Sequence, residues 1–212
     1  MAHYDLEEQE QLDTLKTWWK MHGNLVTSVV TAVCLAVVAW QGWNWYQRGQ
    51  TTQASAVFAV LEQAVINRDA QKTKSAAGEL AEKFGSTSYA GLGALLAAKQ
   101  SFDAGDLKTA KAQLVWAADN GKDEIKDIAR LRLAAVELDD KAYDAALKQL
   151  ETGHSPIFNA RFLELKGDVL AAQGKKAEAR AAYKAAQDKA QSKPGAGREL
   201  LQQKLDSLGE AA

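Results

Sequence analysis

Cysteine and proline are scarce in this sequence of 212 residues, which holds one cysteine and two prolines. The single cysteine, Cys34, lies inside an apolar stretch. The chain on either side of this stretch therefore has no thiol, which excludes disulfides and thiol chemistry there. Runs of β-branched residues are also missing beyond residue 48, where alanine and leucine dominate. These absences predict a helical C-terminal part that is stabilised by packing alone.

Formal charge is absent from residues 21–47. A helix of these 27 residues spans about 40 Å, enough to cross a hydrocarbon core of about 30 Å. The hydroxyls of Thr27, Ser28 and Thr31 are expected to bond back to carbonyls of the same helix. Aromatic residues that favour the headgroup regions stand at its two ends: Trp18, Trp19, Trp40, Trp43, Trp45 and Tyr46. The stretch therefore predicts a transmembrane helix over residues 23–46.

Two alternatives for the apolar stretch stay open. It could be a cleaved secretory signal, since Val37-Val38-Ala39 resembles a cleavage site, or the buried core helix of a soluble domain. A long acidic segment precedes the stretch and bulky aromatic residues follow it, which favours an uncleaved signal anchor. Its length and its tryptophans at both ends argue against a core helix.

Basic residues near the span predict its orientation. Lys16 and Lys20 precede it closely, whereas Arg48 alone follows it within about twenty residues, which favours a cytoplasmic N-terminus. We therefore expect a cytoplasmic tail over residues 1–22 and an exported domain over residues 47–212. The opposite topology, which would make the chain a cytosolic adaptor, is the alternative.

The C-terminal part carries evenly spread charge. From residue 49 onward, 23 lysines and arginines stand against 22 aspartates and glutamates, a formal charge of +1. No basic face stands out, which argues against nucleic acid as a partner. His3, His22 and His154 are scattered, so the sequence predicts no catalytic site, no metal site and no cofactor. A membrane-tethered hydrolase is the rival hypothesis.

Turn-forming residues divide the C-terminal part into short helices that pair as hairpins. Ser155-Pro156 is expected to start a helix, with the serine as its cap and the proline in its first position. The breaks fall 14 to 20 residues apart. They are Asn67-Arg68-Asp69, Gly85-Ser86-Thr87, Asp103-Ala104-Gly105-Asp106, Asp119-Asn120-Gly121, Asp139-Asp140-Lys141, Thr152-Gly153-His154-Ser155, Gln173-Gly174 and Lys193-Pro194-Gly195.

A repeat underlies these hairpins. Aligning three of the turns places Ala110, Ala146 and Ala179 in one column, with spacings of 36 and 33 residues. A period near 34 with a small residue at this point is typical of tetratricopeptide repeats, helix pairs that stack into a solenoid. The third unit fits best, and Glu137 in the second and Ser101 in the first stand at apolar positions. The alternative is that alanine-rich hairpins imitate the repeat by chance.

The predicted fold is thus all-α, with a single N-terminal transmembrane helix followed by a tetratricopeptide-like α-solenoid of helical hairpins. Residues 53–67 and 70–84 give a further, degenerate pair, whose first helix is expected to continue from the membrane segment. Residues 197–208 give a terminal helix. Its apolar face is expected to hold Leu200, Leu201, Leu205 and Leu208.

Repeat arrays of this kind bind other proteins in a groove lined by the first helix of each hairpin. The alternative is that the apolar end of this groove is filled by the first hairpin or the last helix. The sequence shows no basic quartet for gripping a terminal carboxylate. The expected groove residues are Leu92, Leu95, Lys99, Phe102, Ile128, Leu131, Ala135, Leu138, Arg161, Glu164 and Asp168.

The order of several short motifs resembles that of the YfgM family, ancillary subunits of the SecYEG translocon in Gram-negative bacteria. The resemblance covers nearly the whole chain, although Lys166 stands where the family usually has arginine. The motifs are Leu12-xx-Leu15-Lys16 with Trp18-Trp19-Lys20, Trp40-Gln41-Gly42-Trp43, Glu79-Leu80-Ala81-Glu82-Lys83-Phe84, Tyr89-Ala90, Leu95-Leu96-Ala97-Ala98-Lys99, Arg161 to Asp168, and Gly174 to Arg180.

The resemblance implies a single-pass type II protein of the bacterial inner membrane. Its periplasmic repeats would contact the translocon and the membrane-anchored chaperone PpiD, and would help to pass exported polypeptides to periplasmic chaperones. The residues alone give an anchor, an orientation and a partner-binding array. They leave open a scaffold for another envelope complex.

Overall fold

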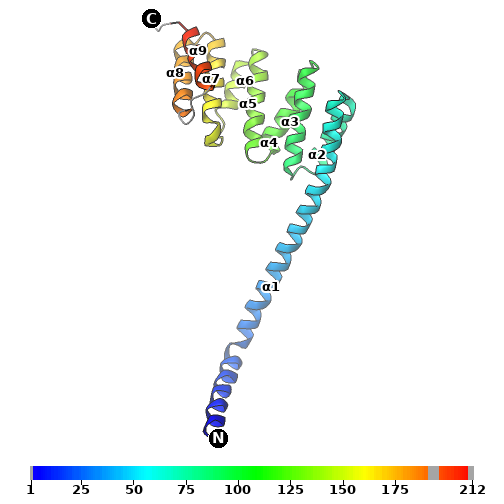
Figure 1. The fold of residues 1–212 in the computed structure, drawn as a ribbon, viewed down its shortest axis with the longest axis vertical. Helices are drawn as coiled ribbons and strands as arrows, with labels where there is room; N and C mark the ends of the chain where they lie inside the picture. Colours follow the sequence, from blue (N-terminus) through cyan, green and yellow to red (C-terminus); the bar gives the residue numbers. More distant parts are fainter. Residues whose placement is uncertain (1, 191–195, 210–212) are drawn as a thin grey trace. The chain divides into compact units, whose positions relative to one another are not determined.

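The computed structural model describes residues 2–190 and 196–209, and every regular element within these residues is a helix. The predicted fold class is confirmed (Figure 1). The helices are α1 (Ala2–Ile66), α2 (Ala70–Lys83), α3 (Ser88–Asp103), α4 (Leu107–Asn120), α5 (Glu124–Asp139), α6 (Tyr143–Leu150), the 3₁₀ turn η1 (Pro156–Phe158), α7 (Asn159–Ala172), α8 (Lys176–Lys189) and α9 (Ala196–Ser207).

The chain forms two compact units, Met1–Gln50 and Thr51–Ala212, here called the N-terminal unit and the repeat unit. The division falls within α1, so the last part of that helix belongs to the repeat unit. The predicted end of the membrane span lies four residues before this division.

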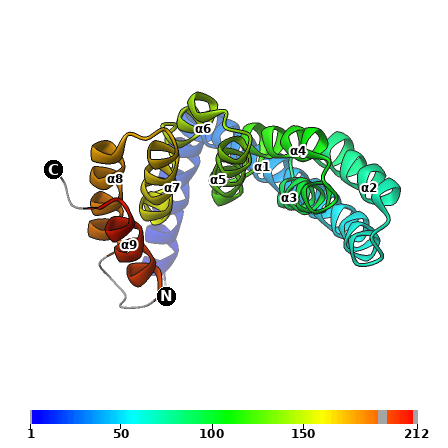
Figure 2. The same cartoon turned by 90° about the horizontal axis from the view of Figure 1, so that it is seen from above.

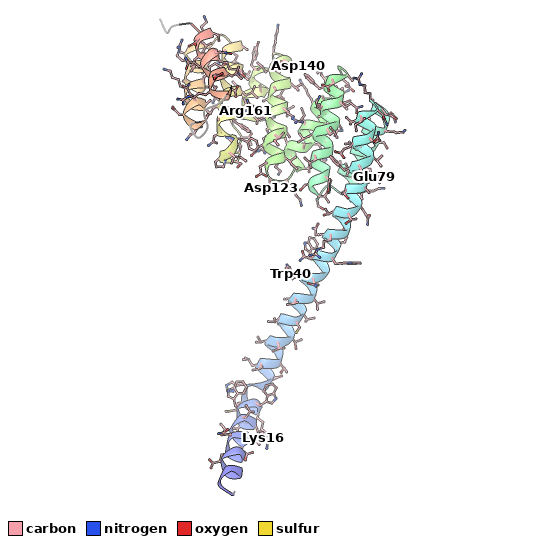
Figure 3. All side chains as sticks on the ribbon, viewed as in Figure 1. Lys16, Trp40, Glu79, Asp123, Asp140 and Arg161 are labelled. Atoms are coloured by element: carbon pink, nitrogen blue, oxygen red, sulfur yellow. The ribbon has the colours of Figure 1, made fainter. Side chains whose placement is uncertain are left out.

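The N-terminal unit turns large apolar side chains outward. Leu25, Val33 and Val38 are exposed, and Trp40 projects from the helix in Figure 3. Only 6 % of the most apolar window of α1 is buried, whereas the core helix of a soluble domain would be mostly buried. By length and composition, α1 is therefore a helix able to cross a membrane.

Hydroxyl groups within the apolar stretch bond to their own helix, as expected. Ser28 Oγ donates to the Asn24 carbonyl at 2.7 Å, Thr31 Oγ1 donates to the Thr27 carbonyl at 2.8 Å, and Thr27 Oγ1 donates to the Gly23 carbonyl. These bonds leave no hydroxyl proton of the three residues without an acceptor, which suits an environment without water.

The repeat unit consists of hairpins that follow one another along the chain (Figure 2). At the turn of each hairpin one residue has positive φ: Arg68 (53°), Gly105 (79°), Lys141 (59°) and Gly174 (77°). Two glycines take this left-handed conformation without a steric cost, whereas Arg68 and Lys141 bear the clash of their Cβ atoms. The common turn geometry supports the alignment of the repeats.

Small residues let the helices of each hairpin approach closely. Ala110, Ala146 and Ala179, the residues of the aligned column, are each 0 % exposed. In the hairpin of α7 and α8, a Cβ atom added to Gly167 would lie 2.4 Å from the ring of Tyr183. The ring of one helix therefore lies directly on the backbone of the other, which only glycine permits.

Among the described residues, four apolar cores follow the hairpins, and the first helix of each hairpin after α1–α2 is shared between two of them. Helix α3 gives Ala90 and Ala97 to the core with α1 and α2, but Leu95 to the core with α4 and α5. Helix α7 likewise gives Phe162 to the core with α5 and α6, and Leu170 to the core with α8 and α9. Stacking thus joins neighbouring hairpins through common helices.

Three local expectations need correction. Ser155 precedes Pro156, but its side chain makes no capping bond; its backbone N–H donates instead to buried Asp127 Oδ2 at 2.8 Å. Leu200 is 41 % exposed, because only Leu201 and Leu205 of α9, together with Leu208 directly after the helix, pack in the core with α7 and α8.

The predicted break at residues 119–121 begins only at Gly121, since Asp119 and Asn120 still belong to α4. The predicted break Lys193-Pro194-Gly195 lies outside the described residues.

Candidate partner-binding groove

A groove of about 460 Å³ lies between α5 and α7, which pack beside each other. Both helices are the first members of their hairpins, and α3 packs on α5 in the same way. The groove is lined by Ile128, Leu131, Arg132, Ala135, Phe158, Arg161, Glu164, Leu165 and Asp168.

The two walls of the groove follow the same helical spacing. The α5 wall uses residues 128, 131, 132 and 135, and the α7 wall uses residues 161, 164, 165 and 168. Both sets fall at i, i+3, i+4 and i+7, the residues of one helix face. Ile128, Leu131 and Ala135 make the α5 wall largely apolar, and Phe158 and Leu165 extend this apolar surface toward α7.

Charged groups on the α7 wall form a network with α9. Lys204 Nζ lies 2.9 Å from Glu164 Oε1 and 2.8 Å from Asp168 Oδ2. The hydroxyl of Tyr183 donates to Asp168 Oδ1 at 2.7 Å, and Arg161 Nη1 donates to Glu164 Oε2 at 3.0 Å. Both carboxylates of the groove are therefore already paired from within the chain.

Burial and hydrogen bonding shift the pKa values in this network. Partial burial by itself would lower the pKa of Lys204, but the hydrogen bonds to Asp168 and Glu164 outweigh it and raise the pKa. Burial, and then the hydrogen bond to Asp168, raise the pKa of Tyr183. Lys204 thus stays charged and Tyr183 stays neutral and hydrogen-bonded throughout the physiological range.

Arg132 and Arg161 bring exposed positive charge to opposite walls of the groove (Figure 3 labels Arg161). In the part of the chain that the structure describes, Arg132 has no carboxylate within ion-pair distance, and its Nη1 donates to the Leu95 carbonyl at 3.4 Å. The side chain of Arg161 is 69 % exposed, and its partner Glu164 is also bonded by Lys204. The apolar lining residues, here called the floor of the groove, are Ile128, Leu131, Ala135, Phe158 and Leu165. The groove therefore combines this apolar floor with two accessible guanidinium groups.

The structure brings together most of the residues predicted on α5 and α7. Ile128, Leu131, Ala135, Arg161, Glu164 and Asp168 all line the groove. Leu138 does not line it, because it packs against the core of α5, α6 and α7.

The residues predicted on α3 do not line this groove. Leu95 is 5 % exposed and belongs to the core of α3, α4 and α5, so it is not a surface residue. Leu92 and Phe102 are each 40 % exposed on α3, and Lys99 Nζ pairs with Asp103 Oδ2 at 2.6 Å. Leu95 is covered by α4 and α5, and not by the first hairpin or the last helix.

Sequence reasoning missed four groove residues: Arg132, Phe158 and Leu165, which line it, and Lys204, which pairs with its carboxylates. Arg132 and Leu165 lie four residues after Ile128 and Arg161, so the helical period could have found them. Phe158 lies in η1 and Lys204 in α9, two elements outside the repeat frame, and no spacing signal points to either.

His22 and His154 make aromatic contacts. His154 stacks on Phe162 with ring centroids 3.8 Å apart and planes 5° apart, and His22 stacks on Trp18 at 5.4 Å. Among the described residues, no group of three or more His, Cys, Asp or Glu side chains could hold a metal ion.

Comparison with known proteins extends over both units. Residues 16–210 match the family described as tetratricopeptide repeat-like domain. An ancillary SecYEG translocon subunit of Neisseria gonorrhoeae is 37 % identical over 208 residues, which cover 96 % of this chain and 98 % of that protein. The chain belongs to this tetratricopeptide repeat-like family.

Two further ancillary SecYEG translocon subunits align over nearly their full length. The protein of Haemophilus influenzae is 32 % identical, covering 97 % of this chain and 99 % of its own, and that of Escherichia coli K12 is 30 % identical, covering 95 % and 96 %. The sequence resemblance to the YfgM family is thus confirmed. No solved structure matches the chain significantly.

Proposed function

We propose that this chain is an ancillary subunit of the SecYEG translocon in the bacterial inner membrane. Three relatives that align over nearly their whole length carry that name, and α1 has the length and composition of a membrane span. In this proposal residues 1–22 form a cytoplasmic tail, residues 23–46 cross the membrane once, and residues 47–212 form a periplasmic repeat domain.

The repeat domain acts in this proposal as a binding module and not as an enzyme. The observation that carries this is the groove between α5 and α7, whose apolar floor is open to a partner. The partners we propose are the translocon, a membrane-anchored chaperone similar to PpiD, and exported polypeptides, which the subunit would help to pass to periplasmic chaperones. The binding residues are those of the groove, with Leu92 and Phe102 as a further exposed apolar pair on α3.

Site-specific crosslinking in cells tests the partner and the site together. A photoreactive residue at Leu131 or Arg161 is expected to crosslink to translocon subunits or to the chaperone, whereas one at exposed Lys148 on α6 should not. Equal crosslinking from all three positions would contradict a groove-specific partner. Capture of another envelope protein alone would favour a scaffold for a different complex.

Protease treatment of spheroplasts tests the orientation. Externally added protease is expected to degrade the repeat unit while leaving the N-terminal tail intact, because Lys16 and Lys20 favour a cytoplasmic tail. Protection of the repeat unit in spheroplasts, with digestion after lysis, would reverse the topology and favour a cytosolic adaptor.

A further inference from the structure

We infer that the groove between α5 and α7 receives an acidic amphipathic helix, with apolar residues on one face and aspartate or glutamate beside them. This inference rests on the proposed function, because it names the chemistry of the partner for the same groove. It is carried by the shape of the floor, by the spacing of the walls and by the placement of Arg132, Arg161 and Lys204.

The floor of the groove favours a helix over an extended peptide. Ile128, Leu131, Ala135 and Leu165 lie on α5 and α7, whose backbone groups are bonded within the helices. An extended peptide on this surface would leave its own N–H and C=O groups without partners, whereas a helix satisfies them internally. Each wall presents its side chains at i, i+3, i+4 and i+7, over about 10 Å, which matches two turns of a docked helix.

The charged groups of the groove favour a partner with negative charge over one with positive charge. Lys204, Arg161 and Tyr183 already occupy the two groove carboxylates, Glu164 and Asp168. A basic partner would have to displace these internal bonds. An acidic partner finds Arg132 on one wall, with no carboxylate partner among the described residues, and exposed Arg161 on the other.

Lys204 of α9 contributes to the preference of the groove for an acidic partner, because it pairs with both groove carboxylates. It adds a third positive charge beside two negative ones, so the groove and its α9 contact carry a net positive charge. Without that ammonium group, Glu164 and Asp168 would face the groove with less compensation and would repel an acidic partner. A change on α9, outside the groove wall, is therefore expected to change the charge preference of the groove.

The test uses the full chain in detergent micelles and two fluorescein-labelled peptides of about fifteen residues, a length able to form a helix on binding. Both peptides carry leucine at i, i+3, i+4 and i+7, and they differ only in having glutamate or lysine at the flanking positions. Fluorescence anisotropy at low ionic strength is expected to show the glutamate peptide binding about tenfold more tightly than the lysine peptide.

Three variants and one control locate the effect. Arg132→Glu and Arg161→Glu are each expected to weaken binding of the glutamate peptide about fivefold or more, and Lys204→Met should reduce the preference for glutamate over lysine. Lys148→Glu, an equal charge change on exposed α6, should leave binding unchanged. If a reversal at either arginine impairs folding, as judged by circular dichroism, Arg132→Gln and Arg161→Gln replace it with a smaller expected loss.

Several results would overturn the inference. These are equal or tighter binding of the lysine peptide, binding of the glutamate peptide that ignores both arginines, and no saturable binding of either peptide. Equal binding of a glutamate peptide with a central proline would overturn the helical form of the partner. Crosslinking to the translocon with any of these results would leave the proposed function standing and reject only this partner chemistry.

Discussion

The apolar stretch of α1 and the hairpins of the repeat unit are both helical, yet they place large and small side chains in opposite ways. In the stretch, Leu25, Val33 and Trp40 are exposed. In the hairpins, Ala110 and Ala179 are fully buried where two helices meet. The comparison shows that a helix-forming apolar sequence need not be part of a core. In the repeat unit, helices pack into a core where a small residue lies at their contact.

The two regions also depend on different sources of stability. The N-terminal unit exposes valines, leucines and tryptophans that an apolar environment would cover. Keeping that surface in water costs about 25 cal/mol per Å² of apolar area relative to an apolar environment. The repeat unit depends on close approach between helices, which leaves no space for an added methyl group at Gly167 or Ala179. Each region is therefore sensitive to a different kind of substitution.

A charge in the apolar stretch has the largest expected effect. Val33→Arg should cost about 2.5–3.5 kcal/mol of membrane insertion, since Val33 lies near the centre of the span. The measurement is the fraction of the chain that resists alkaline extraction from membranes. Gln53→Arg, on an exposed site of the repeat unit, serves as the control and should extract like the native chain. Equal extraction of the two variants would argue against a span.

Overpacking a hairpin contact comes next. Ala179→Leu should destabilise the repeat unit by about 1–3 kcal/mol, because Ala179 is fully buried where α8 meets α7 and α9. The loss of stability is measured as faster hydrogen–deuterium exchange of backbone amides in α7 and α8 of the full chain. Ala181→Leu, two residues away on an exposed site of α8, is the matched control. Similar exchange in both variants would contradict close packing at the aligned alanine column.

The left-handed turns allow a paired substitution of opposite sign. Gly174→Ala should cost about 1 kcal/mol, and Lys141→Gly should gain up to about 1 kcal/mol, because alanine adds and glycine removes a Cβ clash at positive φ. Thermal melting of the full chain, followed by circular dichroism, should show shifts in opposite directions. A shift in the same direction for both would mean that the two turns are not equivalent.

The smallest expected effect concerns Glu137, a carboxylate at an apolar position of the repeat. Burial raises its pKa most, the charge of Lys111, which pairs with Asp140, lowers the pKa by a smaller amount, and the charge of Asp140 raises it by less still. A carboxyl group with a raised folded pKa stabilises the fold fully only below its ordinary pKa, and this contribution is lost as the pH rises through the folded value. Glu137→Gln should therefore melt higher relative to the native chain at pH 7 than at pH 4. A constant difference at the two pH values would show that Glu137 is not coupled to folding.

Much of the repeat unit followed from the position of small residues. The column Ala110, Ala146 and Ala179 predicted the hairpins because a helix contact tolerates only a small side chain there. The groove on α5 and α7 followed from the same frame. The exposure expected for Leu95 was wrong, because α3 packs into two neighbouring cores and buries more of its surface than one groove-facing row of residues predicts.

Contacts between distant elements were beyond the reach of sequence reasoning. Lys204 meets Glu164 across 40 residues, and the Ser155 N–H meets Asp127 across 28. Such pairs depend on where a turn or terminal helix comes to lie, and no local propensity encodes that position. For the same reason the charge balance of the groove became visible only in the structure.

The sharing of α3, α5 and α7 between neighbouring cores has a consequence for biosynthesis. A chain is made from its N-terminus, so the core around α3 and α4 lacks one wall until α5 has been made, and the core around α5 and α6 waits for α7. Each hairpin thus completes the one before it, in the order of synthesis. Among the described residues, Leu201 and Leu205 of α9, with Leu208 directly after it, close the core of α7 and α8, which therefore waits for α9 in the same way.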